Sequence, residues 1–140
     1  MRLQKKFHVD RNRETAVQVM SQDDTLTGLF PDTETEIVER KGNRKTAVSR
    51  YRALGQEGEA TFHFTFEDGG DVRFEKVCDG RVWKKLTGCV EMEGRGDGTR
   101  VLIEMEGSTK GFVPEFTIKG TMQEQIEQMA EALRDRIETS

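Results

Sequence analysis

The side chains that could do acid–base chemistry are few and scattered: His63, Glu75, Lys85, Glu91 and Glu104. Their spacing does not define a nucleophile, a base and an orienting group together, so it assigns no catalytic residue. His63 stands between two phenylalanines in TFHFTF, and strand alternation turns it away from the face that they form. A solvated strand histidine is therefore the better interpretation than a catalytic one.

Metal and disulfide chemistry are not indicated. The two cysteines and two histidines lack metal-ligand spacing, so we expect no metal and no cofactor. Cys78 lies beside the Asp79-Gly80 turn signal, whereas Cys89 lies well along the following strand, on the order of 26 Å away. A disulfide needs Cα atoms within about 7 Å. We therefore expect two free thiols, which is typical of a reducing compartment.

Length and charge set the broad class. The 140 residues suit one domain that spans 1–140. The formal net charge is −4, which disfavours a nucleic-acid-binding protein and a general attraction to anionic membranes. No stretch has the apolar length of a signal peptide or a membrane span, so we expect a cytoplasmic protein.

Hydrophobic periodicity predicts the elements that must position these side chains. It indicates a first strand in MRLQKKFHV, a short helix capped by Asp10, and a second short helix that begins near Ser21 and ends near Pro31. Six strands then follow: TEIVERK, RKTAVSRYRA, EATFHFTF, DVRFEKV, RVWKKLTGCVEM and TRVLIEME. The gaps hold turn residues and are too short for a crossover helix, so neighbouring strands must be antiparallel.

The Asp79-Gly80 signal predicts a two-residue hairpin, which fixes a register. In that register Val77 faces Val82 and Phe74 faces Lys85, which places Trp83 and Lys85 on the inner face with Phe74. Gly88 could be a bulge that reverses the alternation beyond it. An inward Lys85 could pair with a ligand carboxylate, although a lysine that extends to the mouth of a cavity is the simpler interpretation.

The end of the chain changes to a helical period. Thr121 and Glu124 form a capping-box signal, and an apolar stripe of about 25 Å follows it: Met122, Ile126, Met129, Leu133 and Ile137. We expect this helix to cover the sheet face that carries Phe62, Phe64, Phe66, Phe74, Trp83, Val101, Ile103 and Met105.

The order of one strand, two short helices, six antiparallel strands and a long helix resembles the START-like superfamily. This superfamily is also called SRPBCC or helix-grip, and it includes polyketide cyclases, the birch-pollen allergen and an accessory protein of carbon monoxide dehydrogenase. VDRNRETAVQVMSQDDTLTGLFPD is similar to the family's opening passage, and FVPEFTIKGTMQEQIEQMAEALRDRI is similar to its closing one. The resemblance implies an α+β helix-grip fold, in which a strongly curved antiparallel sheet of six to seven strands wraps around the long C-terminal helix.

The resemblance also implies a cavity between the sheet and the C-terminal helix. The residues expected to line it are Phe62, Phe64, Phe66, Phe74, Trp83, Lys85, Ile103, Met105, Met122, Ile126 and Met129. Such a cavity would bind or carry an apolar or amphipathic small molecule. Three alternatives stay open: a filled core with no cavity, a polyketide cyclase- or dehydratase-like enzyme, and an accessory domain that docks on another protein.

Overall fold

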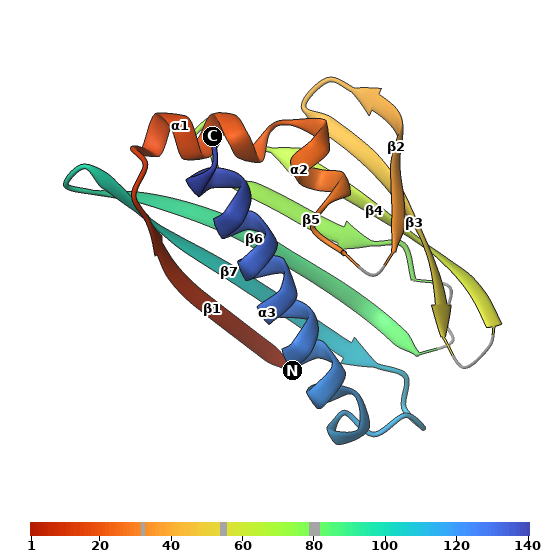
Figure 1. The fold of residues 1–140 in the computed structure, drawn as a ribbon. Coiled ribbons are helices and arrows are strands. Elements are labelled where there is room, and N and C mark those ends of the chain that lie inside the picture. The colour runs from red at the N-terminus through yellow and green to blue at the C-terminus, as the bar shows by residue number, and fades with distance from the viewer. Residues whose placement is uncertain (32, 54–55, 79–81) are drawn as a thin grey trace.

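The computed structural model describes residues 1–31, 33–53, 56–78 and 82–140. The elements in these ranges are β1 (Arg2–Val9), α1 (Arg13–Met20), α2 (Asp23–Thr27), β2 (Glu34–Lys41), β3 (Arg44–Ala53), β4 (Gln56–Phe66), β5 (Val72–Lys76), β6 (Trp83–Arg95), β7 (Gly98–Thr109) and α3 (Phe116–Glu138). Figure 1 shows a curved sheet with all three helices on one side of it. The predicted α+β order of elements is confirmed.

The seven strands form one antiparallel sheet in the order β1-β7-β6-β5-β4-β3-β2. Strands β2 to β7 pair with their neighbours in the chain, as short hairpin connections require. The first strand closes the far edge by pairing with the last, so that Phe7 faces Val101. None of the helices in the described ranges has the length and apolar content needed to cross a membrane.

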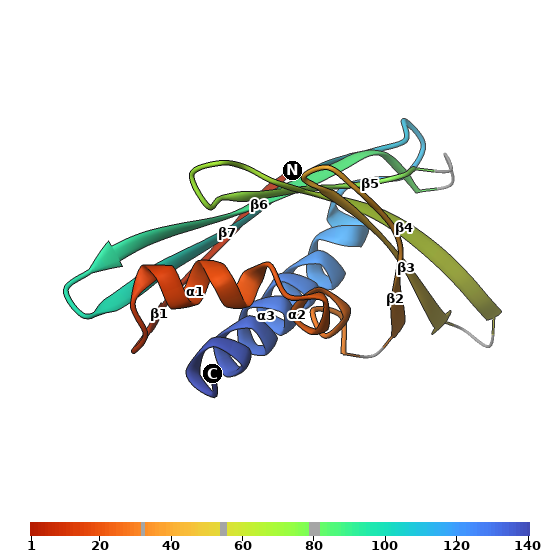
Figure 2. The ribbon, with the colours of Figure 1, turned by 90° about the horizontal axis from the view of Figure 1, so that it is seen from above.

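The long helix α3 lies on the concave side of the sheet (Figure 2). Met122, Ile126, Met129, Leu133 and Ile137 are all buried, as the helical period predicts. The 23 residues of α3 extend over about 35 Å, longer than the stripe alone. From Met122 onward, successive turns of this helix place apolar side chains in the core and leave the opposite side in water.

Three helix starts differ from their predicted positions. The predicted Thr121–Glu124 capping box is wrong, because α3 begins at Phe116 with Glu115 at its N-cap position. The Pro114 carbonyl, just before it, accepts hydrogen bonds from the amide and the hydroxyl of Thr117. Asn12 rather than Asp10 caps α1, through a 2.8 Å hydrogen bond from the Thr15 amide. The second helix begins at Asp23. Several residues near each start can accept the same hydrogen bond, and tertiary packing selects among them.

The predicted β5–β6 register is also wrong. Phe74 faces Gly88 and Glu75 faces Thr87, whereas the two-residue hairpin placed Lys85 opposite Phe74. The bulge lies between Trp83 and Lys85 rather than at Gly88. A Cβ at Gly88 would lie 2.2 Å from the Phe74 ring, so the ring requires a residue without a side chain opposite it. The Asp79-Gly80 turn itself lies outside the described residues.

Candidate ligand site on the concave face

The concave face has two halves, and α3 covers one of them. This helix packs on β1, β7 and α1 rather than over the middle of β3, β4 and β5. Its stripe meets Phe7, Val9, Val101, Ile103 and Met105, and each of these side chains is at most 6% exposed. We call this region the packed half. It is a close-packed core of the kind that fills the space between a sheet and a helix.

Beside the packed half lies a row of aromatic rings. The Phe64 and Phe74 rings lie 5.9 Å apart, and Phe62 stacks on Phe30 at 5.0 Å. Phe30 follows α2, so the short helices rather than α3 close this part of the sheet. These rings form an apolar wall where the two halves meet.

The next row of the concave face is built from small side chains. Ser49 faces Ala60 on one side and Thr35 on the other, and the Val77 amide donates to the Thr61 carbonyl, which brings Cys78 beside this row. The Thr35 and Ser49 hydroxyls lie 2.7 Å apart. Thr35, Ala60 and Cys78 are only half-buried. Ser49 is 2% exposed, and α3 does not pack over this row of small side chains.

Two aromatic side chains and one lysine border this row. The Tyr51 ring lies over Gly58, where a Cβ would come within 2.6 Å of it. Trp83 lies over Gly107 at the same close distance and is half-buried. We call the surface formed by these residues the open half: Thr35, Ser49, Tyr51, Ala60, Lys76, Cys78 and Trp83. It combines flat apolar walls with hydroxyl groups and one amine.

Lys76 takes the position that the sequence assigned to Lys85. Val72 and Phe74 are buried on the concave face, and Lys76 continues their alternation and is half-buried. Lys85 is exposed, so the inward amine expected there is wrong. The signal that identifies Lys76 was present in DVRFEKV itself, since alternate residues of one strand share a face. The two-residue turn predicted at Asp79-Gly80 led to a different register, in which Lys85 was assigned the inward position instead.

The structure does not bring the predicted cavity residues together in one place. Ile103, Met105, Met122, Ile126 and Met129 are buried in the packed half, whereas Phe62, Phe64 and Phe74 form the aromatic row. Phe66 lies apart, with the Lys45 Nζ 5.3 Å from its ring centroid. Trp83 borders the open half, and Lys85 points to solvent. Which of these residues contact a ligand stays a prediction.

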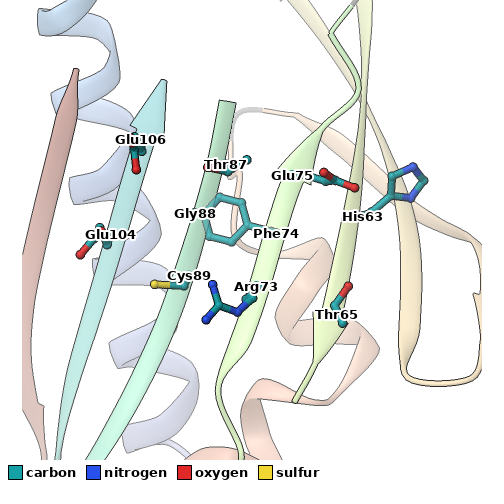
Figure 3. Close-up of a pocket in the computed structure, with 10 residues that line it drawn as sticks. All are labelled: His63, Thr65, Arg73, Phe74, Glu75, Thr87, Gly88, Cys89, Glu104 and Glu106. Atoms are coloured by element: carbon teal, nitrogen blue, oxygen red, sulfur yellow. The ribbon is translucent and has the colours of Figure 1, made fainter. Parts of the chain in front are cut away.

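A depression of about 390 Å³ lies on the opposite, convex face (Figure 3). Three acid–base candidates line it, His63, Glu75 and Glu104, together with Arg73 and Cys89. Their charges and polar atoms are mostly satisfied locally. Glu104 pairs with Arg2 at 2.7 Å, Arg73 pairs with Glu67 at 3.1 Å, and His63 shares a 2.8 Å hydrogen bond with the Thr46 hydroxyl. This is the pattern of a solvated outer sheet face.

The chemistry available on the convex face is weak. Burial raises the pKa of the Cys89 thiol, and the nearby Glu91 and Glu104 carboxylates raise it further, so the sulfur stays protonated. His63 stands two strands away, about 10 Å by strand spacing, which prevents a thiolate–imidazole pair. No metal-binding group of three His, Cys, Asp or Glu side chains occurs in the described part of the chain. Both cysteines are free thiols, as expected.

Comparison with solved structures identifies the fold. A START superfamily protein from Mycobacterium smegmatis matches with a TM-score of 0.77 and 19% identity, over 99% of this chain and 97% of the other. An aromatase/cyclase from Streptomyces sp. R1128 matches at 0.76 and 10% identity, over 99% and 92%. A STAR-related lipid transfer protein from Xanthomonas axonopodis matches at 0.71 and 17%, over 97% and 85%.

At these identities the likeness concerns the fold, and the chain has the START-like helix-grip fold. No protein-family model and no curated protein sequence matches this chain. Solved structures with this fold include both a lipid transfer protein and an aromatase/cyclase. The fold is therefore compatible with both binding and catalysis, and the function has to be inferred from the side chains of the site.

Proposed function

We propose that this protein is a cytoplasmic carrier or sensor that binds an apolar or amphipathic small molecule in the open half. The observation that carries the proposal is the row of small side chains beside the aromatic row, on a part of the sheet that α3 does not cover; Thr35, Ala60 and Cys78 are half-buried there and Ser49 is buried. A filled core would place large apolar side chains there, as the packed half does.

The lining also indicates the chemistry of the ligand. The half-buried Trp83 ring offers a flat surface for an acyl chain or an aromatic ring, next to the buried Phe62 and Phe74 rings. Lys76 and the Tyr51 hydroxyl are the polar groups at the border of the same surface. An amphipathic molecule with a carboxylate or another hydrogen-bond acceptor at one end matches this distribution.

A cyclase-like enzyme has less support. Of the five acid–base candidates, Glu75, Lys85 and Glu91 are exposed, and His63 and Glu104 line the convex depression. Among the described residues, an enzyme at the open half would depend on Lys76, Tyr51 and the Cys78 thiol, with none of those five candidates beside them. A binding function needs no such group. An accessory domain that docks on another protein would leave the open half without a ligand.

Tryptophan fluorescence tests the proposal, because Trp83 is the sole tryptophan and borders the open half. We expect lauric acid to change its emission in a saturable way. Ala60→Phe should abolish this change by filling the small-residue row. Thr65→Phe adds the same ring to the convex depression and should leave it intact. Full binding by Ala60→Phe, or its loss in Thr65→Phe, would place the ligand elsewhere.

A further inference from the structure

Two phenylalanines lie outside the core. Phe112 is 82% exposed and Phe116 is 81% exposed, whereas the other six phenylalanines are buried or half-buried. Phe112 lies between β7 and α3, and Phe116 is the first residue of α3. Two large rings this exposed, a few residues apart, are unusual in a chain with so lean a core, and they mark an interaction surface.

Four lysines belong to the segments that meet at the same end of the molecule as these two rings. The Lys110 amide donates to the Val82 carbonyl at 3.0 Å, which holds the segment after β7 against the start of β6. Figures 1 and 2 both show the start of β6, the end of β7 and the start of α3 at one end of the molecule. We call this surface the lysine–phenylalanine patch: Val82, Lys84, Lys85, Lys110, Phe112, Phe116 and Lys119.

The patch has a net positive charge, although the chain carries −4. None of its four lysines forms an ion pair with another described residue, and the acidic residues that flank Lys110 in the sequence are Glu106 and Glu115. The basic tip of the β2–β3 hairpin differs, because Arg40 and Lys45 both pair with Asp23 and Arg44 pairs with Glu39. A concentration of positive charge beside exposed aromatic rings is therefore a property of the patch.

We propose that the lysine–phenylalanine patch docks the protein on the surface of an anionic phospholipid bilayer. The Phe112 and Phe116 rings enter the boundary between headgroups and acyl chains, and the lysines contact lipid phosphates. Lys119 lies three residues after Phe116 and therefore on the same side of α3, so ring and amine approach the bilayer together.

A bilayer fits this surface better than a second copy of the chain. A symmetric dimer through the patch would set its four lysines against four others, and like charges across an interface are repulsive. Lysine is also depleted in protein–protein interfaces. The inference goes beyond the ligand proposal and does not depend on it, because the patch lies on the exterior of the protein.

Vesicle sedimentation with the ligand-free protein tests the inference. We expect sedimentation with vesicles of equimolar phosphatidylcholine and phosphatidylglycerol, and none with phosphatidylcholine alone. The double variant Phe112→Ser/Phe116→Ser should lower the affinity by at least about tenfold. Lys84→Glu/Lys119→Glu should lower it by about fivefold or more for each lysine, and added salt should act in the same direction.

Matched controls lie at the other side of the sheet. Val38→Ser removes an apolar side chain that is 52% exposed on β2, and Lys41→Glu reverses a charge at the basic hairpin tip; both should sediment as the parent protein does. Circular dichroism should show that the patch variants stay folded. The inference is overturned by no sedimentation with either vesicle, by equal loss in the controls, or by a dimer that Phe112→Ser/Phe116→Ser abolishes.

Discussion

The packed half and the open half are parts of the same concave face, yet they differ in what they can do. In the packed half, the side chains of β1 and β7 that lie beneath the α3 stripe are at most 6% exposed: Phe7, Val9, Val101, Ile103 and Met105. In the open half, Ser49, Ala60 and Cys78 carry small side chains, and α3 does not pack above them. The path of one helix across a curved sheet therefore determines which part of the sheet face is covered as core and which part stays available as a site.

The largest expected effect lies in the packed half. Ile126→Ala or Leu133→Ala removes a fully buried side chain and should lower the free energy of unfolding by about 2–5 kcal/mol. Thr35→Ala in the open half removes little apolar surface but breaks the 2.7 Å hydrogen bond to the buried Ser49 hydroxyl, and should cost about 1 kcal/mol. Urea denaturation measures both. Similar costs in the two halves would show that they do not differ in packing.

Substitution of Gly88 tests how tightly the aromatic row packs against β6. Gly88→Ala should destabilise by about 1–3 kcal/mol, since its Cβ would lie 2.2 Å from the Phe74 ring and 2.7 Å from the Glu104 carbonyl oxygen. The matched control is Gly69→Ala, where nothing lies within 4 Å of a Cβ. Thermal unfolding should separate the two variants clearly. An unaffected Gly88→Ala protein would mean that the aromatic row is loosely packed.

The two lysines give a smaller effect on binding. Lys76→Ala should weaken the binding of lauric acid by about 1 kcal/mol, or about fivefold, because the amine borders the open half. Lys85→Ala removes the same group from an exposed position and should leave the affinity unchanged. Isothermal titration calorimetry can compare them. If Lys85→Ala proved the weaker binder, the hairpin register first predicted would describe the protein better.

The smallest effect concerns the network that ties α2 to β2 and β3. Hydrogen bonds from Lys45 and then Arg40 hold the pKa of Asp23 below its ordinary value. A lowered pKa stabilises the folded state above about pH 4, and this contribution is lost as the pH falls through the folded-state pKa.

Asp23→Asn should therefore cost less than about 1 kcal/mol at neutral pH, since the pair is partly exposed and screened. The difference from the parent protein should shrink in acid, and urea denaturation at several pH values measures it. A difference that grows on acidification would contradict the sign of the shift.

Much of the fold could be predicted from local patterns. Short gaps with turn residues specify an antiparallel meander, and the apolar period of α3 specifies which of its side chains are buried. The β5–β6 register could not be predicted, because it depends on the Phe74 ring against Gly88, a contact between strands. The placement of Lys85 failed for the same reason.

The extent of the open half could not be predicted either. It depends on the diagonal path of α3 and on the curvature of the sheet, and no local pattern encodes these. The start of α3 at Phe116 was missed because Thr121 and Glu124 imitate a capping box. Phe112 and Phe116 read as ordinary apolar residues in the sequence, and only the structure shows that they are exposed.

Amide and indole chemical shifts during a titration with lauric acid test directly whether the ligand binds in the open half. Binding in the open half should produce saturable shifts at Ala60, Cys78 and the Trp83 indole. Thr65 and Thr87, which line the convex depression, should stay unchanged. Shifts confined to Thr65 and Thr87, or no saturable shift at any of these residues, would contradict a ligand site on the concave face.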